Sequence, residues 1–268
     1  MAAKNTSIVC HNLNFSIGEQ VLLSDLSCEF SAQKITVILG QNGAGKSTLI
    51  NCLSKQVNPT HGIIEFNGES LKNLSYMYLA SKRAVLSQKN QLAFSMSVNE
   101  FIGLGLQARA DINNAGFAEL QKQLLHHFDL QALQQRDVLT LSGGEAQRAQ
   151  LARVIAQIWP SAQNPLASFA GKWLLLDEWT AGLDLHHQQI LVELLQNLVK
   201  QGLSIVMVVH DLNLAAQVAD EVVLLKNGYL IAQGQPSETL TPDLIEDVLQ
   251  LKISLYPRDE NKYPLFLK

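Results

Sequence analysis

The sequence predicts an α/β fold with a mostly parallel β-sheet and helices on both faces. Short apolar runs, which are typical of buried strands, alternate along the chain with segments of helical periodicity. Residues 7–34 instead alternate apolar and polar side chains, which indicates an antiparallel β subdomain. From about residue 90 to residue 157 the pattern is helical, so we expect a helical insert within the chain.

The first core strand is predicted at residues 35–39, a β-branched apolar run that ends in a glycine-rich loop. A strand at residues 62–66 leads into Asn67-Gly68, a strong signal for a type I′ hairpin turn. In the helical insert, residues 97–100 have the Ser-x-x-Glu spacing of a capping box. One apolar helix face then follows, made of Phe117, Leu120, Leu124, Leu125 and Phe128.

The second half of the chain continues the alternation of strand and helix. Strands are predicted at residues 173–176 and 204–209 because both stretches are apolar and short. The helix between them has an apolar face made of Ile190, Leu191, Leu194, Leu195 and Leu198. A closing hairpin is predicted at residues 221–232, with its turn at Asn227-Gly228.

Composition limits the class of protein. The chain has 268 residues and a net charge of −4, so no bulk basic field favours nucleic acid as a partner. No apolar run approaches the roughly 20 residues that a membrane-spanning helix needs. The first six residues lack the apolar core of a signal peptide. We therefore expect a soluble chain in the cytosol, or one that docks on a membrane from the cytosolic side.

The most informative motif occupies residues 40–48 and fits G-x-x-x-x-G-K-[ST], the phosphate-binding P-loop. It lies between a predicted strand and a predicted helix, which is the context that the motif requires. Its glycines let backbone N–H groups close around phosphate oxygens. Lys46 can reach the β- and γ-phosphates of a nucleotide, and Ser47 can ligate Mg²⁺. The expected nucleotide-binding residues of this motif are Gly40, Gln41, Asn42, Gly43, Ala44, Gly45, Lys46, Ser47 and Thr48.

A second anion site is predicted where another helix begins. The residues that open this amphipathic helix are Leu141, Ser142, Gly143, Gly144 and Glu145. The helix is expected to continue through Ile158. Ser142 and Glu145 have the spacing of a capping box, and capping alone is the structural alternative. The two glycines, however, leave bare N–H groups at a helix N-terminus, which can bind an anion.

A P-loop followed by LSGGE in one chain resembles the ATP-binding cassette (ABC) family, whose signature motif is LSGGE or LSGGQ. The resemblance implies a RecA-like P-loop NTPase core that hydrolyses ATP with Mg²⁺. It also implies a homodimer of ATPase subunits, in which the P-loop of one and the signature of the other enclose each ATP. We expect one ABC nucleotide-binding domain over residues 1–268, with a core and β subdomain at about 1–87 and 160–245, a helical subdomain at about 88–159 and a C-terminal tail at 246–268.

The remaining motifs of the family follow in its order. A strand that ends in two acids resembles Walker B, in which Asp177 would hold Mg²⁺ and Glu178 would orient or deprotonate the attacking water. A helix cap is the structural alternative for Glu178. Asp184 lies in a stretch that resembles the D-loop, which crosses the dimer interface in the family. His210 resembles the switch histidine that contacts the γ-phosphate, and Gln88 resembles the Q-loop glutamine, an expected catalytic residue and Mg²⁺ ligand.

Two positions depart from the family pattern. Family members usually carry Pro after the catalytic Glu, whereas this chain has Trp179. The adenine of ATP usually stacks on an aromatic residue just before an early Gly, where this chain has Ile17, with Phe15 two residues earlier. Either Phe15 reaches the base or Ile17 provides only apolar contact.

Within the family, the sequence indicates an importer ATPase. A DNA-repair or chromosome ATPase would carry a long coiled coil, a ribosome-acting factor normally has two cassettes, and a fused exporter would have membrane spans. The sequence is most similar to the ATPases of bacterial heme uptake systems at residues 87–98, at Arg136-Asp137, at residues 150–171 and at residues 184–189. The ATPases of ferric-siderophore and cobalamin importers are the alternatives, and a non-transport ABC ATPase is a further one.

The resemblance to heme importers also implies partners and a location. Two ATPase subunits would dock on a transmembrane permease dimer at the cytoplasmic face of the bacterial inner membrane, as peripheral proteins. A periplasmic heme-binding protein would be an indirect partner. The ATPase does not touch the transported molecule in this type of transporter, so ATP hydrolysis would be coupled to hemin uptake through the permease.

Overall fold

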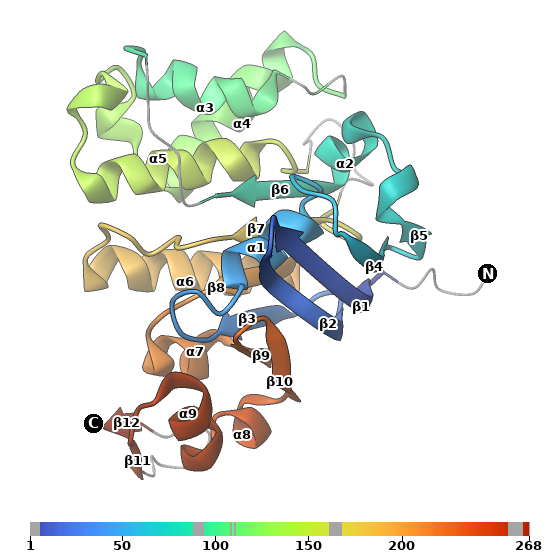
Figure 1. Ribbon diagram of the computed structural model, residues 1–268. Coiled ribbons are helices and arrows are strands. Elements are labelled where there is room, and N and C mark those ends of the chain that lie inside the picture. The colour runs from blue at the N-terminus through green and yellow to red at the C-terminus, as the bar shows by residue number, and fades with distance from the viewer. Residues whose placement is uncertain are drawn as a thin grey trace. The chain divides into compact units, whose positions relative to one another are not determined.

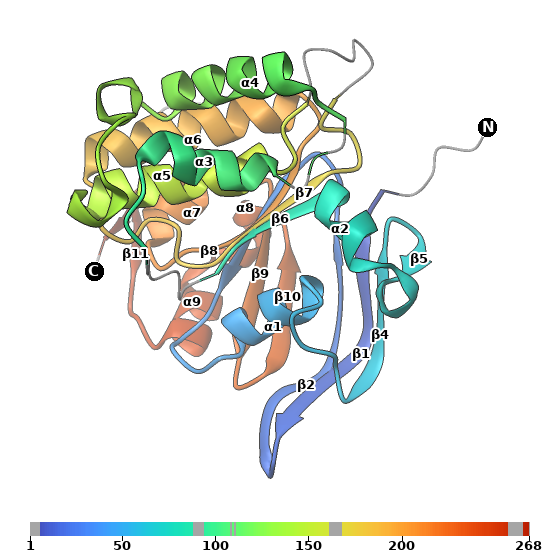
Figure 2. The same ribbon diagram turned by 90° about the horizontal axis from the view of Figure 1, so that it is seen from above.

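The computed structural model describes residues 6–87, 94–107, 109, 111–160, 168–256 and 265–267. The chain forms two compact units, whose elements are labelled in Figures 1 and 2. The first unit comprises Met1–Leu74 and Ile205–Lys268, and the second comprises Ser75–Ser204. Both units combine strands with helices, which confirms the α/β class predicted from the sequence.

An antiparallel sheet forms the amino-terminal part of the first unit. Its strands are β1 (Ile8–Ile17), β2 (Gln20–Phe30), β4 (His61–Phe66) and β5 (Glu69–Ser70). They are ordered β2-β1-β4-β5, and Leu13, Leu26 and Phe30 are among the buried side chains that the alternating pattern predicts. Between β4 and β5, Asn67 and Gly68 have φ of 51° and 80°, so the expected type I′ turn is confirmed.

Parallel strands form the core of the same unit. They are β3 (Ile35–Leu39), β8 (Ser204–Val208) and β9 (Glu221–Lys226), with β10 (Tyr229–Gly234) at the edge. β3 pairs in parallel with both β8 and β9, whereas β10 pairs antiparallel with β9. Every residue of β3 and β8 is buried, which explains why these runs do not alternate with polar residues. The turn at Asn227 and Gly228 again has two positive φ values, 49° and 84°.

Helices and a terminal hairpin accompany these strands in the described part of the first unit. They are α1 (Lys46–Leu53), the 3-10 turn η1 (Leu71–Asn73), α7 (Leu212–Val218), α8 (Pro236–Thr239), α9 (Pro242–Leu249), β11 (Ser254–Tyr256) and β12 (Leu265–Leu267). The carboxyl-terminal helices α8 and α9 each begin with Pro at the first helical position, which suits its fixed φ and missing N–H. The sequence analysis assigned no element to residues 246–268, where α9 ends and the hairpin of β11 and β12 forms.

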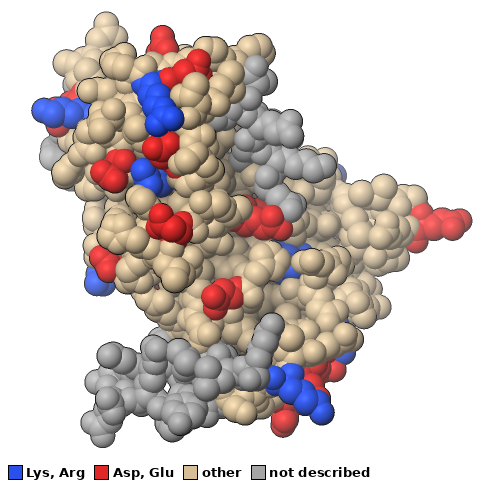
Figure 3. Space-filling view, turned by 90° about the vertical axis from the view of Figure 1, so that its left-hand side faces the viewer, with Lys and Arg blue, Asp and Glu red and all other residues tan. Residues whose placement is uncertain are grey.

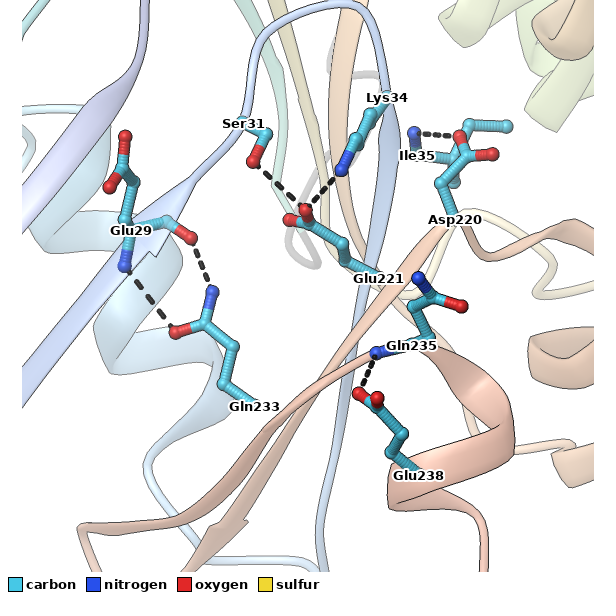
Figure 4. Close-up of polar contacts among 9 residues, drawn as sticks. All are labelled: Glu29, Ser31, Lys34, Ile35, Asp220, Glu221, Gln233, Gln235 and Glu238. Atoms are coloured by element: carbon cyan, nitrogen blue, oxygen red, sulfur yellow. Dashed lines mark hydrogen bonds and ion pairs between the residues drawn. The ribbon is translucent and has the colours of Figure 1, made fainter.

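Polar contacts join the two sheets of the first unit, as Figure 4 shows. The carboxylate of Glu221 accepts hydrogen bonds from Ser31 Oγ at 2.9 Å and from Lys34 Nζ at 2.5 Å. Farther along, the side-chain amide of Gln233 in β10 exchanges two hydrogen bonds with the backbone of Glu29 in β2. These contacts fix the antiparallel sheet to the parallel strands at the end of β2.

The second unit contains a pair of parallel strands and a helical region. The strands are β6 (Arg83–Leu86) and β7 (Trp173–Leu176), which pair in parallel. The helical elements are α2 (Tyr76–Lys82), α3 (Val98–Leu106), α4 (Asn114–His127), η2 (Gln131–Leu133), η3 (Val138–Thr140), α5 (Gly143–Ala156) and α6 (Leu185–Lys200). The predicted capping box of α3 is confirmed, because Ser97 and Glu100 exchange hydrogen bonds through side chain and backbone.

Helix α5 ends at Ala156, two residues before the Ile158 that the sequence analysis predicted. The N–H groups of Ile158 and Trp159 bond to carbonyls three residues earlier, at 3.0 and 3.3 Å, which tightens the chain into a turn. The guanidinium of Arg109 donates to the backbone O of Ala156 and of Trp159. The predicted end was therefore two residues too late, because the chain tightens into this turn after Ala156, where Arg109 also binds.

Close packing of α3 on α5 depends on Gly105. A Cβ at this position would lie 2.0 Å from the backbone O of Arg153 and 2.9 Å from the Cβ of Ala156. We expect Gly105→Ala to lower the free energy of unfolding by about 1–3 kcal/mol, the usual cost of overpacking. Urea unfolding of both proteins measures this difference. Leu104→Ala, at the neighbouring exposed position, is the control, and equal stability of wild type and Gly105→Ala would contradict the packing.

Candidate nucleotide-binding and active site

The predicted P-loop links β3 to α1 within the first unit. Gly43 and Gly45 have φ of 83° and 99°, in the left-handed region that favours Gly. A Cβ on Gly40 would lie 2.4 Å from the backbone O of Leu225, so this position also excludes a side chain. Helix α1 begins at Lys46, and its N-cap Gly45 has no side chain to cap the first amides. The loop thus combines backbone N–H groups with the positive end of a helix, which suits a phosphate.

Lys46 is the cation of this loop and is only 6% exposed. Its Nζ donates hydrogen bonds to the backbone O of Gly40 and of Gln41, both at 2.8 Å. These contacts hold the ammonium group over the loop. A phosphate oxygen is a stronger acceptor than a neutral carbonyl because it is charged, so an entering phosphate can replace these partners. The position of Lys46 therefore suits binding of a nucleotide phosphate.

The other P-loop residues differ in exposure. Asn42 is exposed, whereas Ala44 is buried and donates its N–H to the backbone O of Gln41 at 3.1 Å. Ser47 and Thr48 are half-buried in the first turn of α1. The strand, loop and helix that the motif requires are all present, and the contacts of these residues with a nucleotide stay predictions.

The β1–β2 hairpin lies against the P-loop, because a Cβ on Gly45 would lie 2.7 Å from the backbone O of Leu22. Near the tip of this hairpin, Ile17 is 64% exposed, whereas Phe15 is half-buried. A flat base can cover the exposed face of Ile17 without any change in the sheet. Of the two candidates for the adenine contact, the exposed surface favours Ile17.

His210 lies two residues after the end of β8 and is exposed. The next residue, Asp211, caps α7, since its Oδ1 accepts the N–H of Asn213 at 2.7 Å and of Leu214 at 3.1 Å. Because β3 and β8 are parallel neighbours, the P-loop and His210 both follow the carboxyl ends of strands at one edge of the sheet. The fold therefore brings these two predicted elements of the site to the same edge.

In the second unit, the two predicted Walker B acids follow β7 directly. Asp177 is 4% exposed, and its N–H donates to the backbone O of Leu86 at 2.8 Å. Glu178 has φ of 51°, which is uncommon for a residue with a Cβ. The backbone O of Glu178 accepts the N–H of Ala181 at 3.3 Å, which closes a tight turn. Helix α6 is capped by Asp184, so capping of that helix does not account for Glu178.

The predicted signature motif begins α5. Ser142 Oγ accepts the N–H of Glu145 at 3.3 Å, and Glu145 Oε2 accepts the N–H of Ser142 at 2.7 Å, so the capping box is confirmed. This hydrogen bond from the Ser142 backbone lowers the pKa of the Glu145 carboxyl. Because Gly143 and Gly144 have no side chains, nothing of their own covers the N–H groups in the first turn of α5. Anion binding by these residues stays a prediction beside the confirmed cap.

The predicted D-loop packs on the signature motif within the same unit. Gly182 has φ of 76°, and a Cβ there would lie 3.2 Å from the backbone C of Gly143. Asp184 then caps α6, because its Oδ1 accepts the N–H of His187 at 2.8 Å. This hydrogen bond lowers the pKa of Asp184. Asp184 thus has a structural role inside one chain, and its role between two chains stays a prediction.

A cavity of about 320 Å³ lies between the end of β7 and the start of α5. Asp177 and Glu178 line it together with Gln147 and Gln150. The sequence analysis did not identify these two glutamines as site residues. They lie four and seven residues after Gly143, so all three residues share one face of the helix. This helical spacing from the signature motif could have identified the two glutamines from the sequence.

The predicted site residues are divided between the two units. The first unit carries the P-loop, the β1–β2 hairpin and His210, and the second carries the Walker B acids, the signature motif and Asp184. Gln88, which is expected as a catalytic residue and Mg²⁺ ligand, lies outside the described residues.

The donor set expected for Mg²⁺ suits a hard cation, since Ser47 offers a hydroxyl and Asp177 a carboxylate. Asp177 is buried just after β7 and lines the cavity, and Ser47 is half-buried next to the P-loop lysine in the sequence. Among the described residues, no group of three or more His, Cys, Asp and Glu side chains could hold a metal ion. Mg²⁺ in phosphate-transfer sites takes only one or two protein ligands besides phosphate and water, so the residues present fit it.

Charge and hydropathy add two observations. Acidic and basic side chains are interspersed on the face that Figure 3 shows, and the net charge of the chain is −4. That face does not present the basic stripe that binding to a nucleic-acid backbone requires. Across the described residues, no helix combines the length and the apolarity needed to cross a bilayer.

A glycine-rich loop between a buried parallel strand and a helix, with a lysine held over it, is the arrangement of a P-loop NTPase. A family model described as ABC transporter matches residues 23–160. The chain belongs to the ABC transporter family and is an ATPase of this type, as the order of its motifs predicted.

Curated relatives match nearly the whole chain. The Hemin import ATP-binding protein HmuV of Rhodopseudomonas palustris (strain BisB5) is 36% identical over 263 residues, which cover 98% of this chain and 97% of the relative. The protein of the same name from Escherichia coli O157:H7 is 38% identical over 261 residues, which cover 97% of this chain and 98% of the relative.

Solved structures share the fold. An ATP-binding subunit of an ABC transporter has a TM-score of 0.74 at 23% identity, covering 92% of this chain and 95% of that chain. The cbiO1 protein of Clostridium perfringens, described as part of the ABC transporter complex cbiONQ, has a TM-score of 0.73 at 26% identity, covering 91% of this chain and 94% of that chain.

Replacement of Lys46 tests the P-loop directly. Lys46→Met removes the cation and both loop contacts, so we expect ATP affinity to fall by roughly tenfold or more, the equivalent of one charged hydrogen bond. Titration with a fluorescent ATP analogue measures the affinity. Lys55→Met is a matched control, because Lys55 Nζ also bonds two backbone carbonyls, those of Lys72 and Leu74, away from the P-loop. An equal loss of affinity in both variants would contradict a specific role of Lys46.

Proposed function

We propose that this chain is the ATP-hydrolysing subunit of a bacterial importer that takes up hemin through a separate membrane permease. The observation that carries this proposal is the near full-length similarity to proteins named Hemin import ATP-binding protein. The fold and the P-loop support ATP as the energy source. The substrate enters the proposal through the relatives alone, because the chain is expected not to touch it.

The complete ATP site is proposed to form between two copies of the chain. Each copy carries one P-loop and one signature motif, and these lie on different compact units. In a head-to-tail homodimer, the amides of one P-loop and the start of α5 from the other chain would hold the same nucleotide. Ile17 would contact the adenine, with Phe15 as the alternative. Asp184 would lie at the interface between the two chains.

The catalytic roles follow from the charges and hydrogen-bonding groups of the site. Glu178 would orient or deprotonate the attacking water, and His210 would contact the γ-phosphate. Gln88 would complete the site as a catalytic residue. Ser47, Gln88 and Asp177 would hold Mg²⁺, which neutralises charge on the phosphates when bound.

The permease is proposed to dock near the Q-loop. Phe94 lies just after it and is 74% exposed, which leaves an apolar ring available to a partner. Two ATPase subunits would bind a permease dimer at the cytoplasmic face of the inner membrane, with a periplasmic heme-binding protein on the far side. Within each subunit, the proposed helical subdomain at about residues 88–159 would carry this contact.

Glu178→Gln tests the role of the second Walker B acid. The amide keeps the size of the side chain and cannot accept a proton, so ATP turnover should fall by roughly 10²–10⁴-fold. ATP binding should persist, and size-exclusion chromatography with ATP should show a trapped dimer. Turnover near the wild-type value would contradict the role of Glu178. Wild-type rates that stay linear in protein concentration down to nanomolar, without a permease, would contradict the two-chain site.

Uptake by the assembled transporter tests the substrate. The chain is reconstituted with its permease in vesicles, and the heme-loaded binding protein should stimulate ATP hydrolysis and lead to heme inside the vesicles. Stimulation requires coupling through the permease, since the sites are distant. If ferric siderophore or cobalamin supports uptake and heme does not, the proposed substrate is wrong while the ATPase assignment is unaffected.

A further inference from the structure

The backbone at Glu178 is in an unfavourable conformation that needs support from its surroundings. Its φ of 51° places a residue with a Cβ in the left-handed region, which persists only where neighbouring contacts determine it. The contact within the turn itself is the bond from the N–H of Ala181 to the backbone O of Glu178, at 3.3 Å. The residue that follows, Trp179, adds contacts beyond the turn.

Trp179 provides two such contacts. Its indole is fully buried, with 0% exposure. Its backbone O accepts a hydrogen bond from Nε2 of Gln147 at 2.7 Å. Among the described residues, the indole Nε1 has no hydrogen-bond partner, so the ring is held by packing and the carbonyl provides the polar anchor. Trp179, the residue that follows Glu178, is therefore held by the burial of its own side chain and by the amide of Gln147 at its carbonyl.

Gln147 connects helix α5 to the turn that follows β7. It lies in the second turn of α5, the helix that begins with the signature residues Ser142 and Gly143. It is half-buried and lines the same cavity as Glu178. A single side-chain amide thus links the signature helix to the backbone that carries the Walker B glutamate of the same chain.

We propose that Gln147 is a positioning residue for Glu178. By holding the carbonyl of Trp179, it sets the direction in which the Glu178 carboxylate leaves the strand. It also transmits any shift of the signature helix to that carboxylate, because the helix and the turn are joined by this bond. The inference rests on the proposed role of Glu178 in ATP hydrolysis. A misplacement of a catalytic group by about 1 Å can reduce the rate by a factor on the order of 10².

Gln147→Met is the principal test, since Met has a similar length and cannot donate a hydrogen bond. We expect kcat for ATP hydrolysis to fall by roughly 10- to 100-fold, with KM for ATP unchanged, because the P-loop is not altered. Gln147→Asn is a second variant that keeps the amide and shortens its reach by one methylene. It should show the same loss of kcat with unchanged KM, and thermal unfolding of each variant establishes that it is folded.

Gln157→Met is the matched control. Gln157 follows the other end of α5, and its side-chain amide donates to the backbone O of Ala80 at 2.7 Å and of Arg83 at 3.0 Å. Its replacement removes the same kind of bond far along the helix from Glu178, so kcat should stay near the wild-type value. Equal loss of kcat in Gln147→Met and Gln157→Met, or a raised KM at unchanged kcat, would overturn the inference.

Glu178→Gln, measured in parallel, separates the inference from the function on which it rests. If Glu178→Gln loses turnover while both Gln147 variants keep wild-type kcat, the positioning role is wrong and the catalytic role of Glu178 is retained. If Glu178→Gln keeps full turnover, the proposed catalytic role is wrong, and the positioning role is overturned with it.

Discussion

The P-loop is held between β2 and the β9–β10 turn, and the phosphate-binding half of the site depends on this contact. The N–H of Gly228 donates to the backbone O of Ala44 at 3.1 Å, and the O of Gly228 accepts the N–H of Ser24 at 3.0 Å. A Cβ on Gly228 would lie 2.8 Å from the backbone O of Leu22, and a Cβ on Gly45 would lie 2.7 Å from the same atom. Gly45 and Gly228 thus both pack on the carbonyl of Leu22. Backbone contacts among the P-loop, β2 and the β9–β10 turn support the loop.

This contact explains why the antiparallel sheet matters for function. The β1–β2 hairpin that supports the P-loop also carries the exposed Ile17, so one hairpin serves the phosphate loop and the proposed adenine surface. The bonds of Glu221 and Gln233 fix the base of that hairpin to the parallel strands. In the second unit, glycines again allow backbone to meet backbone, where Gly182 packs on Gly143. A Cβ would clash at Gly45 and Gly228 beside the P-loop, and it would crowd the backbone at Gly182.

Features set by neighbouring residues were predicted well. The capping boxes that begin α3 and α5, the type I′ turn at Asn67-Gly68 and the hairpin turn at Asn227-Gly228 involve residues within a few positions of each other. The end of α5 was missed by two residues because the chain turns after Ala156, where Arg109, 47 residues earlier in the chain, donates to the Ala156 carbonyl. Helix α9 was missed although its start carries the signals of Thr241 at the N-cap and Pro242 at the first helical position. The terminal hairpin was missed because each of its strands has only three residues.

The sequence by itself determined the P-loop, the order of the motifs and thereby the family, because these depend on residue types at fixed spacings. Tertiary structure decided that Ile17 is exposed while Phe15 is half-buried, and that the side-chain amide of Gln147 reaches the backbone O of Trp179. The physical reason is that such contacts join residues far apart in the chain. Whether a side chain is covered, or which carbonyl an amide reaches, follows from the packing of whole elements and not from local pattern.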